Sequence, residues 1–132
     1  MIVRTTRNCS IAFLIAALSA IAAPTADAEL ISLHIPDGLL TGCSYIVSAD
    51  LTTPPSQPAA VTFYDHAAPI PGLVEYHPDT GTATIAWTPT WKGEHMIAAI
   101  ELEPGGLASG RAVPVQVVGD GADLGSSCAR IA

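Results

Sequence analysis

Histidine is the residue in this sequence best suited to chemistry, because imidazole can ligate a metal or move a proton near neutral pH. The four histidines are scattered along the chain, at His34, His66, His77 and His95. None has a second histidine or a cysteine at the short spacing typical of a metal site. The sequence therefore predicts no metal site and no cofactor. His95 alternates with Ile97 and Ala99, so we expect a packed side chain, hydrogen-bonded near a loop.

Nucleophilic catalysis has little support in the sequence. The chain contains no Gly-x-Ser-x-Gly segment, the turn that presents a nucleophilic serine in many hydrolases. Ser126 and Ser127 lie near the C-terminus without a base at a motif spacing. Asp65 and His66 are adjacent, and neighbouring side chains on a strand point to opposite faces. They are therefore not expected to form a catalytic dyad.

Carboxylates are the remaining candidates for chemistry. Glu101 and Glu103 share one face of a predicted strand, which acid–base catalysis could use, but a solvated strand end explains them more simply. Asp37, Asp120 and Asp123 lie in glycine-rich loops that would suit Ca²⁺, yet they lack the ordered spacing of a calcium loop. We therefore predict that the protein is not an enzyme.

Trp91 is the strongest indication of a binding site. It lies in a predicted loop between two strands, where an exposed tryptophan usually has a contact. One interpretation is a binding hot spot for a partner or a sugar ring, formed with Tyr64 or Tyr76. The other is a plug that caps one end of the core. Trp87, in contrast, is predicted to be a core residue by its position on a strand.

The scaffold that must position these residues is predicted to be all-β. Apolar residues alternate with polar ones in short segments, separated by proline and glycine turns every 8–12 residues or so. We expect about seven strands in an antiparallel β-sandwich, near residues 30–35, 43–49, 61–64, 73–76, 82–88, 93–100 and 112–118. Pro114 suggests that the last strand lies at a sheet edge. Residues 119–125 are predicted to form a flexible tail that ends in Cys128.

The first 28 residues have the features of a cleaved export signal. Arg4 and Arg7 precede an apolar stretch over residues 11–23, and Ala26-Asp27-Ala28 has the small-x-small form of a cleavage site. The alternative is a membrane anchor, which needs about 20 apolar residues. We expect cleavage after Ala28. Residues 1–28 are then a Sec signal peptide, and residues 29–132 form a single domain.

The expected mature chain is acidic, with three basic residues against eleven acidic ones and a net charge of about −8. Such a chain has no electrostatic footprint for nucleic acid, and we expect no membrane insertion after cleavage. Two cysteines remain, Cys43 and Cys128, in an oxidising compartment. We predict a disulfide between them, which would close a loop of about 85 residues and stabilise the fold by roughly 4–5 kcal/mol. A free thiol pair and a metal site are the alternatives.

Three segments carry a resemblance to a known family. They are Val-Thr-Phe-Tyr-Asp at residues 61–65, a Gly-Thr-Ala-Thr strand ending in Thr-Pro at residues 81–89, and Gly-x-His-x-Ile-x-Ala at residues 93–99. The residues of these segments and their order resemble those of the immunoglobulin-like domains of bacterial surface and secreted proteins. The resemblance implies an immunoglobulin-like sandwich outside the cytoplasm, with an adhesive, spacer or ligand-binding role and no shared catalytic residue. The placement of Cys43 and Cys128 looks like that of stand-alone secreted members.

The chain departs from the family pattern at two places. The usual Asn-Gly-type turn is replaced by residues 65–68, and the normally small and polar loop after Thr-Pro holds a tryptophan. We therefore expect a secreted protein, extracellular or associated with the cell envelope, that binds an unknown protein or cell-surface ligand. The alternative is a small-ligand or carbohydrate-binding module that uses the loop around Trp91. The candidate binding residues are Trp91, Tyr64, Asp65 and His66.

Overall fold

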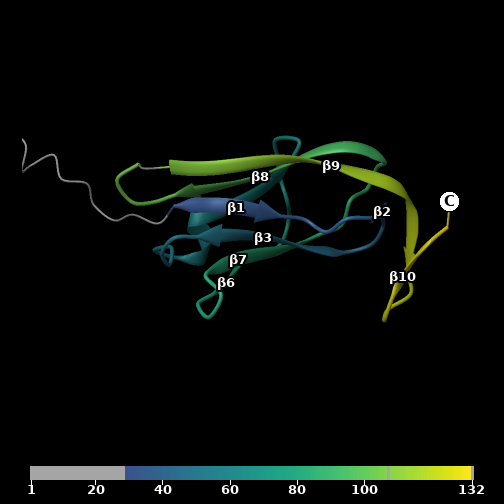
Figure 1. The fold of residues 1–132 in the computed structure, drawn as a ribbon, viewed down its shortest axis with the longest axis horizontal. Coiled ribbons are helices and arrows are strands. Elements are labelled where there is room, and N and C mark those ends of the chain that lie inside the picture. Colours follow the sequence, from purple (N-terminus) through teal and green to yellow (C-terminus); the bar gives the residue numbers. More distant parts are fainter. Residues whose placement is uncertain (1–28, 107, 132) are drawn as a thin grey trace, which may run out of the picture.

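The structure is a computed structural model that describes residues 29–106 and 108–131 (Figure 1). The expected export signal, residues 1–28, lies outside the described residues. The described chain forms ten strands and one single-turn helix, η1 (Pro58–Ala60). In chain order the strands are β1 (Leu30–His34), β2 (Leu39–Thr41), β3 (Tyr45–Leu51), β4 (Val61–Asp65), β5 (Ala68–Pro69), β6 (Glu75–His77), β7 (Thr82–Trp87), β8 (Gly93–Leu102), β9 (Ala108–Asp123) and β10 (Cys128–Arg130).

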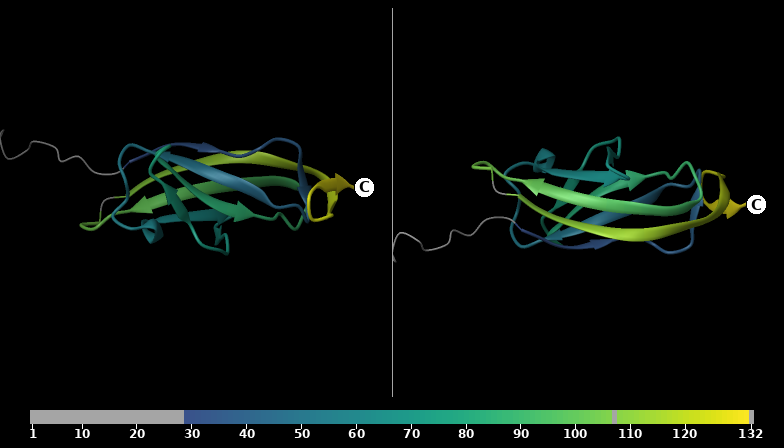
Figure 2. Two further views of the ribbon diagram at one scale, coloured as in Figure 1. Left: turned by 90° about the horizontal axis from the view of Figure 1, so that it is seen from below. Right: turned by 90° about the horizontal axis from the view of Figure 1, so that it is seen from above.

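These strands form two sheets that pack face to face, as the two views of Figure 2 show. One sheet has the order β1-β3-β7-β6, and the other has the order β10-β9-β8-β4-β5, with β2 added in parallel beside β9. All other strand pairs are antiparallel. The prediction of an all-β sandwich is confirmed. The count of about seven strands was too low, because β2, β5 and β10 have only two or three residues each, too few to give a clear alternation.

Alternating side chains of both sheets fill the space between them. The residues predicted to face inward on β4, β7 and β8 are all buried. This confirms the predicted alternation of inward and outward side chains along these strands. They are Val61, Phe63, Ile85, Trp87, Ile97 and Ala99. The predicted strand at residues 73–76 is shifted, since β6 begins at Glu75. Within the described residues, no helix has the length and apolarity to cross a membrane.

The C-terminal segment differs most from the prediction. Instead of a flexible tail, β9 continues to Asp123, pairs with β2 from Val117 onward, and turns back into β10. Figure 1 shows this hairpin bending over one end of the sandwich. The prediction failed because the glycine-rich composition of residues 119–125 hides contacts with strands far away in sequence. Pro114 lies before the stretch of β9 that pairs with β2, in agreement with the edge position predicted for it.

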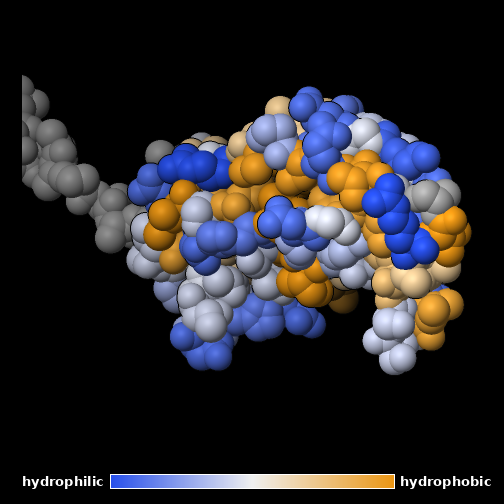
Figure 3. All heavy atoms as spheres, turned by 45° about the vertical axis from the view of Figure 1, so that its right-hand side comes forward, coloured by the Kyte–Doolittle hydropathy of each residue, from blue (hydrophilic) through white to orange (hydrophobic). Residues whose placement is uncertain are grey.

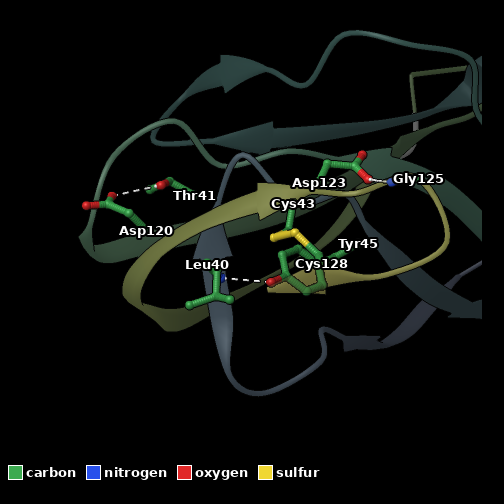
Figure 4. The surroundings of a disulfide bond; sticks show 8 residues. All are labelled: Leu40, Thr41, Cys43, Tyr45, Asp120, Asp123, Gly125 and Cys128. Carbon is green, nitrogen blue, oxygen red and sulfur yellow. Dashed lines mark hydrogen bonds between the residues drawn. A yellow bond between two sulfur atoms is a disulfide. The ribbon is translucent and has the colours of Figure 1, made fainter. Parts of the chain in front are cut away.

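The predicted disulfide between Cys43 and Cys128 holds this hairpin against the start of β3 (Figure 4). Beside it, the Thr41 hydroxyl donates to Asp120 Oδ1 over 2.8 Å. Gly121 packs closely here, because a Cβ atom at that position would come within 3.0 Å of the Thr41 carbonyl and even closer to Cys43 Sγ. The glycine is thus required by packing, and the hairpin is an integral part of the fold.

Candidate functional site

The ends of β4 and β7, the start of β8 and the loop between β7 and β8 bring five side chains together. We call these residues, Asp65, His66, Trp87, Trp91 and His95, the Trp91 cluster. The cluster lies at the same end of the sandwich as the disulfide, because the loop that carries it is tied to that end. The Gly42 amide donates to the Pro89 carbonyl over 3.0 Å, and the Lys92 ammonium lies 3.3 Å from Asp120 Oδ2.

His95 is the fully buried centre of the Trp91 cluster. Its Nδ1 lies 2.8 and 2.9 Å from the two carboxyl oxygens of Asp65, and its Nε2 lies 2.8 Å from the Trp91 carbonyl oxygen. A carboxylate and a carbonyl both accept, so a proton must lie on Nε2 and another between Nδ1 and the carboxyl group. The prediction of a packed, hydrogen-bonded His95 is confirmed.

Asp65 also accepts a hydrogen bond from the indole of Trp87, whose Nε1 lies 3.2 Å from Oδ2. Trp87 is nearly fully buried, as its strand position predicted. One carboxyl group thus joins a residue of each sheet, since Trp87 lies on β7 and His95 on β8. Polar groups that are buried and fully hydrogen-bonded hold their neighbours in a single arrangement. This network fixes the inner side of the site.

Trp91 stacks on this network and still reaches the surface. Its ring lies 3.6 Å from the His95 ring, centroid to centroid, with planes 20° apart. The His66 centroid lies 5.1 Å from Trp91 and 6.0 Å from His95, which puts a nearly right angle at Trp91. His66 therefore stands beside the indole edge. Trp91 remains 42% exposed, so the indole face opposite His95 is left for contact. The side chain both caps the core end and presents an open surface.

The turn that carries His66 is strained. Asp65 pairs with Ala68 across a two-residue hairpin, and its central residues, His66 and Ala67, have φ of 52° and 69°. This region favours glycine or asparagine, and each other residue costs about 1–2 kcal/mol there. The hairpin forms despite the absence of an Asn-Gly turn. The Met96 amide donates to His66 Nδ1 over 3.1 Å, which places the His66 proton on Nε2.

A cleft of about 300 Å³ opens beside Trp91. Its polar lining comes from Asp65, Thr88 and Thr90, and its apolar lining from both tryptophans and residues 68–71. The structure thus brings together three of the four candidate binding residues. The fourth, Tyr64, alternates with the buried Phe63 and points to the outer face of the sheet. Trp87 and His95 were predicted only as core residues, and their polar atoms were the available signal that they could belong to a site.

Glu101 corrects the prediction of a solvated strand end. It is fully buried near the end of β8, and neither carboxyl oxygen has a hydrogen-bond partner among the described residues. Burial raises its pKa to about 7, and the neighbouring Glu103 carboxyl adds to the shift. The signal was present in the sequence, because Glu101 continues the alternation of His95, Ile97 and Ala99. Glu103 remains partly exposed and accepts a hydrogen bond from the Ser56 amide at 3.3 Å.

The aspartates considered as calcium ligands are either hydrogen-bonded to other groups or lie apart from one another. The Thr41 hydroxyl and then Lys92 hold the pKa of Asp120 below its usual range, and Asp123 accepts from the Gly125 amide at 2.9 Å. Among the side chains described in residues 29–106 and 108–131, no group of three or more His, Cys, Asp or Glu is placed to hold a metal ion.

Comparisons with protein-family models, with curated proteins and with solved structures found no match. The site is therefore interpreted from its own geometry. A planar aromatic ring with one face fixed and one face open, beside a small cleft with hydroxyl and carboxyl groups, is an arrangement suited to binding. Other exposed apolar residues lie on or near the C-terminal hairpin, at Val118, Leu124 and Ile131. Figure 3 shows apolar surface at this end of the molecule.

Proposed function

We propose that this chain is a secreted, non-enzymatic immunoglobulin-like domain that binds a protein or cell-surface ligand through the Trp91 cluster. The observation that carries the proposal is the fixed and half-exposed indole of Trp91. Aromatic side chains dominate binding energy at interfaces. A side chain that is already ordered loses little conformational entropy when a partner binds. Stacking on the buried His95 supplies that order before any ligand arrives.

The immunoglobulin-like assignment is supported by the strand order. An immunoglobulin sandwich has strands A, B, E and D in one sheet and strands C, F and G in the other. The order β1-β3-β7-β6 facing β9-β8-β4-β5 corresponds to A-B-E-D facing G-F-C-C′. The disulfide departs from the antibody pattern, because it joins the segment before β3 to β10 rather than linking the two sheets through strands B and F.

A place outside the cytoplasm is supported by the disulfide and by the apolar N-terminal segment with its small-x-small site. Disulfides persist mainly in oxidising compartments. The Cys43–Cys128 bond spans 85 positions of sequence and ties the last strand to the sandwich. A reducing environment would remove this covalent link between the C-terminal hairpin and the start of β3. We therefore propose that the protein acts in the extracellular space or at the cell envelope.

The test is capture of ligand by the purified, oxidised protein from extracts of the producing organism's envelope and medium. Trp91→Ala removes the open indole. Ile46→Ala is the matched control, because Ile46 is an exposed apolar residue on β3 and does not line the cleft beside Trp91. We expect the captured component to bind the wild type and Ile46→Ala equally, and Trp91→Ala roughly tenfold or more weakly. Equal binding by all three proteins would overturn the proposal.

A further inference from the structure

We propose that the ligand held on the open face of Trp91 is a neutral saccharide, a sugar ring of a surface or extracellular glycan. This inference rests on the proposed function and names the ligand class of the same site. Three properties of the Trp91 cluster and its cleft support it: the free indole face, the polar groups at the border of the cleft, and the absence of Lys and Arg from its lining.

The first property is the shape of the aromatic surface. His95 covers one face of the indole at 3.6 Å, and His66 stands at its edge, so that a single flat face is open. The face of an aromatic ring is electronegative. The C–H bonds on one side of a sugar ring carry partial positive charge and lie flat, so they match this face. The adjoining cleft of about 300 Å³ is at the small end of ligand sites, which suits one sugar unit.

The second property is the set of polar groups at the border of the cleft. A carboxylate offers about four lone-pair sites. His95 and Trp87 donate to Asp65, and its side chain keeps 19% of its surface exposed, so a ligand hydroxyl can still donate to it. Thr88 and Thr90 add hydroxyl groups that both donate and accept. Sugar hydroxyls require this mixture, whereas an apolar peptide side chain would leave these groups without partners.

The third property is charge. The residues that line the cleft include no Lys or Arg, and the nearby Lys92 is paired with Asp120. With a net charge of −7 for the chain, an anionic ligand would be repelled. The Asp65 carboxyl group already accepts hydrogen bonds from His95 and Trp87, so a cationic ligand would compete with these two partners. A neutral ligand neither meets this repulsion nor requires a charged partner in the cleft.

The test is binding of the oxidised protein to an array of neutral and acidic oligosaccharides, followed by titration of the neutral ones that bind. We expect roughly tenfold or weaker binding by Trp91→Ala, an intermediate loss for Trp91→Phe, and no change for Ile46→Ala. Thr90→Val replaces only the hydroxyl, at an exposed position, with a methyl group and should weaken binding without affecting folding. Raising the salt to about 1 M should leave the affinity unchanged, because no charge pairing is involved.

Two outcomes would overturn the inference. Binding only to acidic sugars, with a steep loss of affinity in salt, would contradict the neutral class. Failure to bind any saccharide, combined with capture of a protein partner that depends on Trp91, would refute the saccharide and leave the proposed function standing. If the captured component is not a saccharide and binds Trp91→Ala as well as the wild type, both the inference and the proposed function fail.

Discussion

His95 and Glu101 lie on the same inner face of β8 and are both fully buried, yet their surroundings are opposite. Both nitrogens of His95 have partners, supplied by Asp65 and the Trp91 carbonyl. Neither oxygen of Glu101 has a partner among the described residues. Strand alternation buries an ionisable group without regard to what will face it. The neighbouring strands and loops then decide whether that group becomes a fixed support or an uncompensated cost.

This difference in hydrogen bonding gives the two ends of the sandwich different properties. At the His95 end, the hydrogen-bonded Asp65–His95 pair holds the Trp91 indole in place, and this is the end to which we assign ligand binding. At the Glu101 end, the adjacent charges do not compensate the carboxyl group. Glu103 is a second carboxyl group that raises the Glu101 pKa further, and Arg111 donates to the Ile31 and Gly110 carbonyls instead. This end should therefore respond to pH.

The largest expected effect comes from breaking the paired end. Asp65→Ala removes the partner of His95 and Trp87 and leaves a buried imidazole without its acceptor. Removing one member of a buried pair typically costs about 3–5 kcal/mol. We expect a loss of that size in the free energy of unfolding, measured by urea denaturation. Asp79→Ala, in an exposed turn, is the control and should change stability by less than about 0.5 kcal/mol. Equal losses would show that the network does not support the site.

The next effect concerns the unpaired end. The pKa of Glu101 is raised from 4.5 to about 7, so the folded state retains its proton at a pH where the unfolded state has lost it. The contribution of Glu101 to stability is then fully present below about pH 4.5, and about 3 kcal/mol of it is lost in total as pH rises through 7. Unfolding measured from pH 4.5 to pH 8 should show this decline, and Glu101→Gln should abolish it. Glu75→Gln, at an exposed position on β6, is the control and should leave the decline unchanged. A decline that persists in Glu101→Gln would refute the assignment.

A smaller effect tests the strain beside the site. Ala67 has φ of 69°, a conformation that glycine adopts freely. Ala67→Gly should therefore stabilise the protein by about 1 kcal/mol, because relief of the strained turn outweighs the added freedom of the unfolded chain. Thermal unfolding measures the change. Ala86→Gly, on β7 with ordinary strand geometry, should instead destabilise by about 0.5–1 kcal/mol. Destabilisation by both substitutions would mean that the turn stores no strain.

The sequence was sufficient where structure depends on local alternation. It predicted the inward positions of Phe63, Trp87 and Ile97, and also the disulfide, since only two cysteines remain after the expected cleavage. It was insufficient where contacts are long-range. The course of β9 beyond Gly119 depends on β2 and on packing around Cys43. The partnership of Asp65 with His95 arises from strands thirty residues apart, and local spacing gives no sign of it.

The most direct test of the account is to locate bound ligand on the molecule. A neutral oligosaccharide selected from the array would be titrated into isotopically labelled protein while backbone and indole N–H signals are followed by NMR. We expect shifts concentrated at Trp91, His66 and Thr90, with the signals around Glu101 unchanged. Shifts centred on the Glu101 end, or equal shifts in Trp91→Ala, would contradict the assignment of binding to the Trp91 cluster.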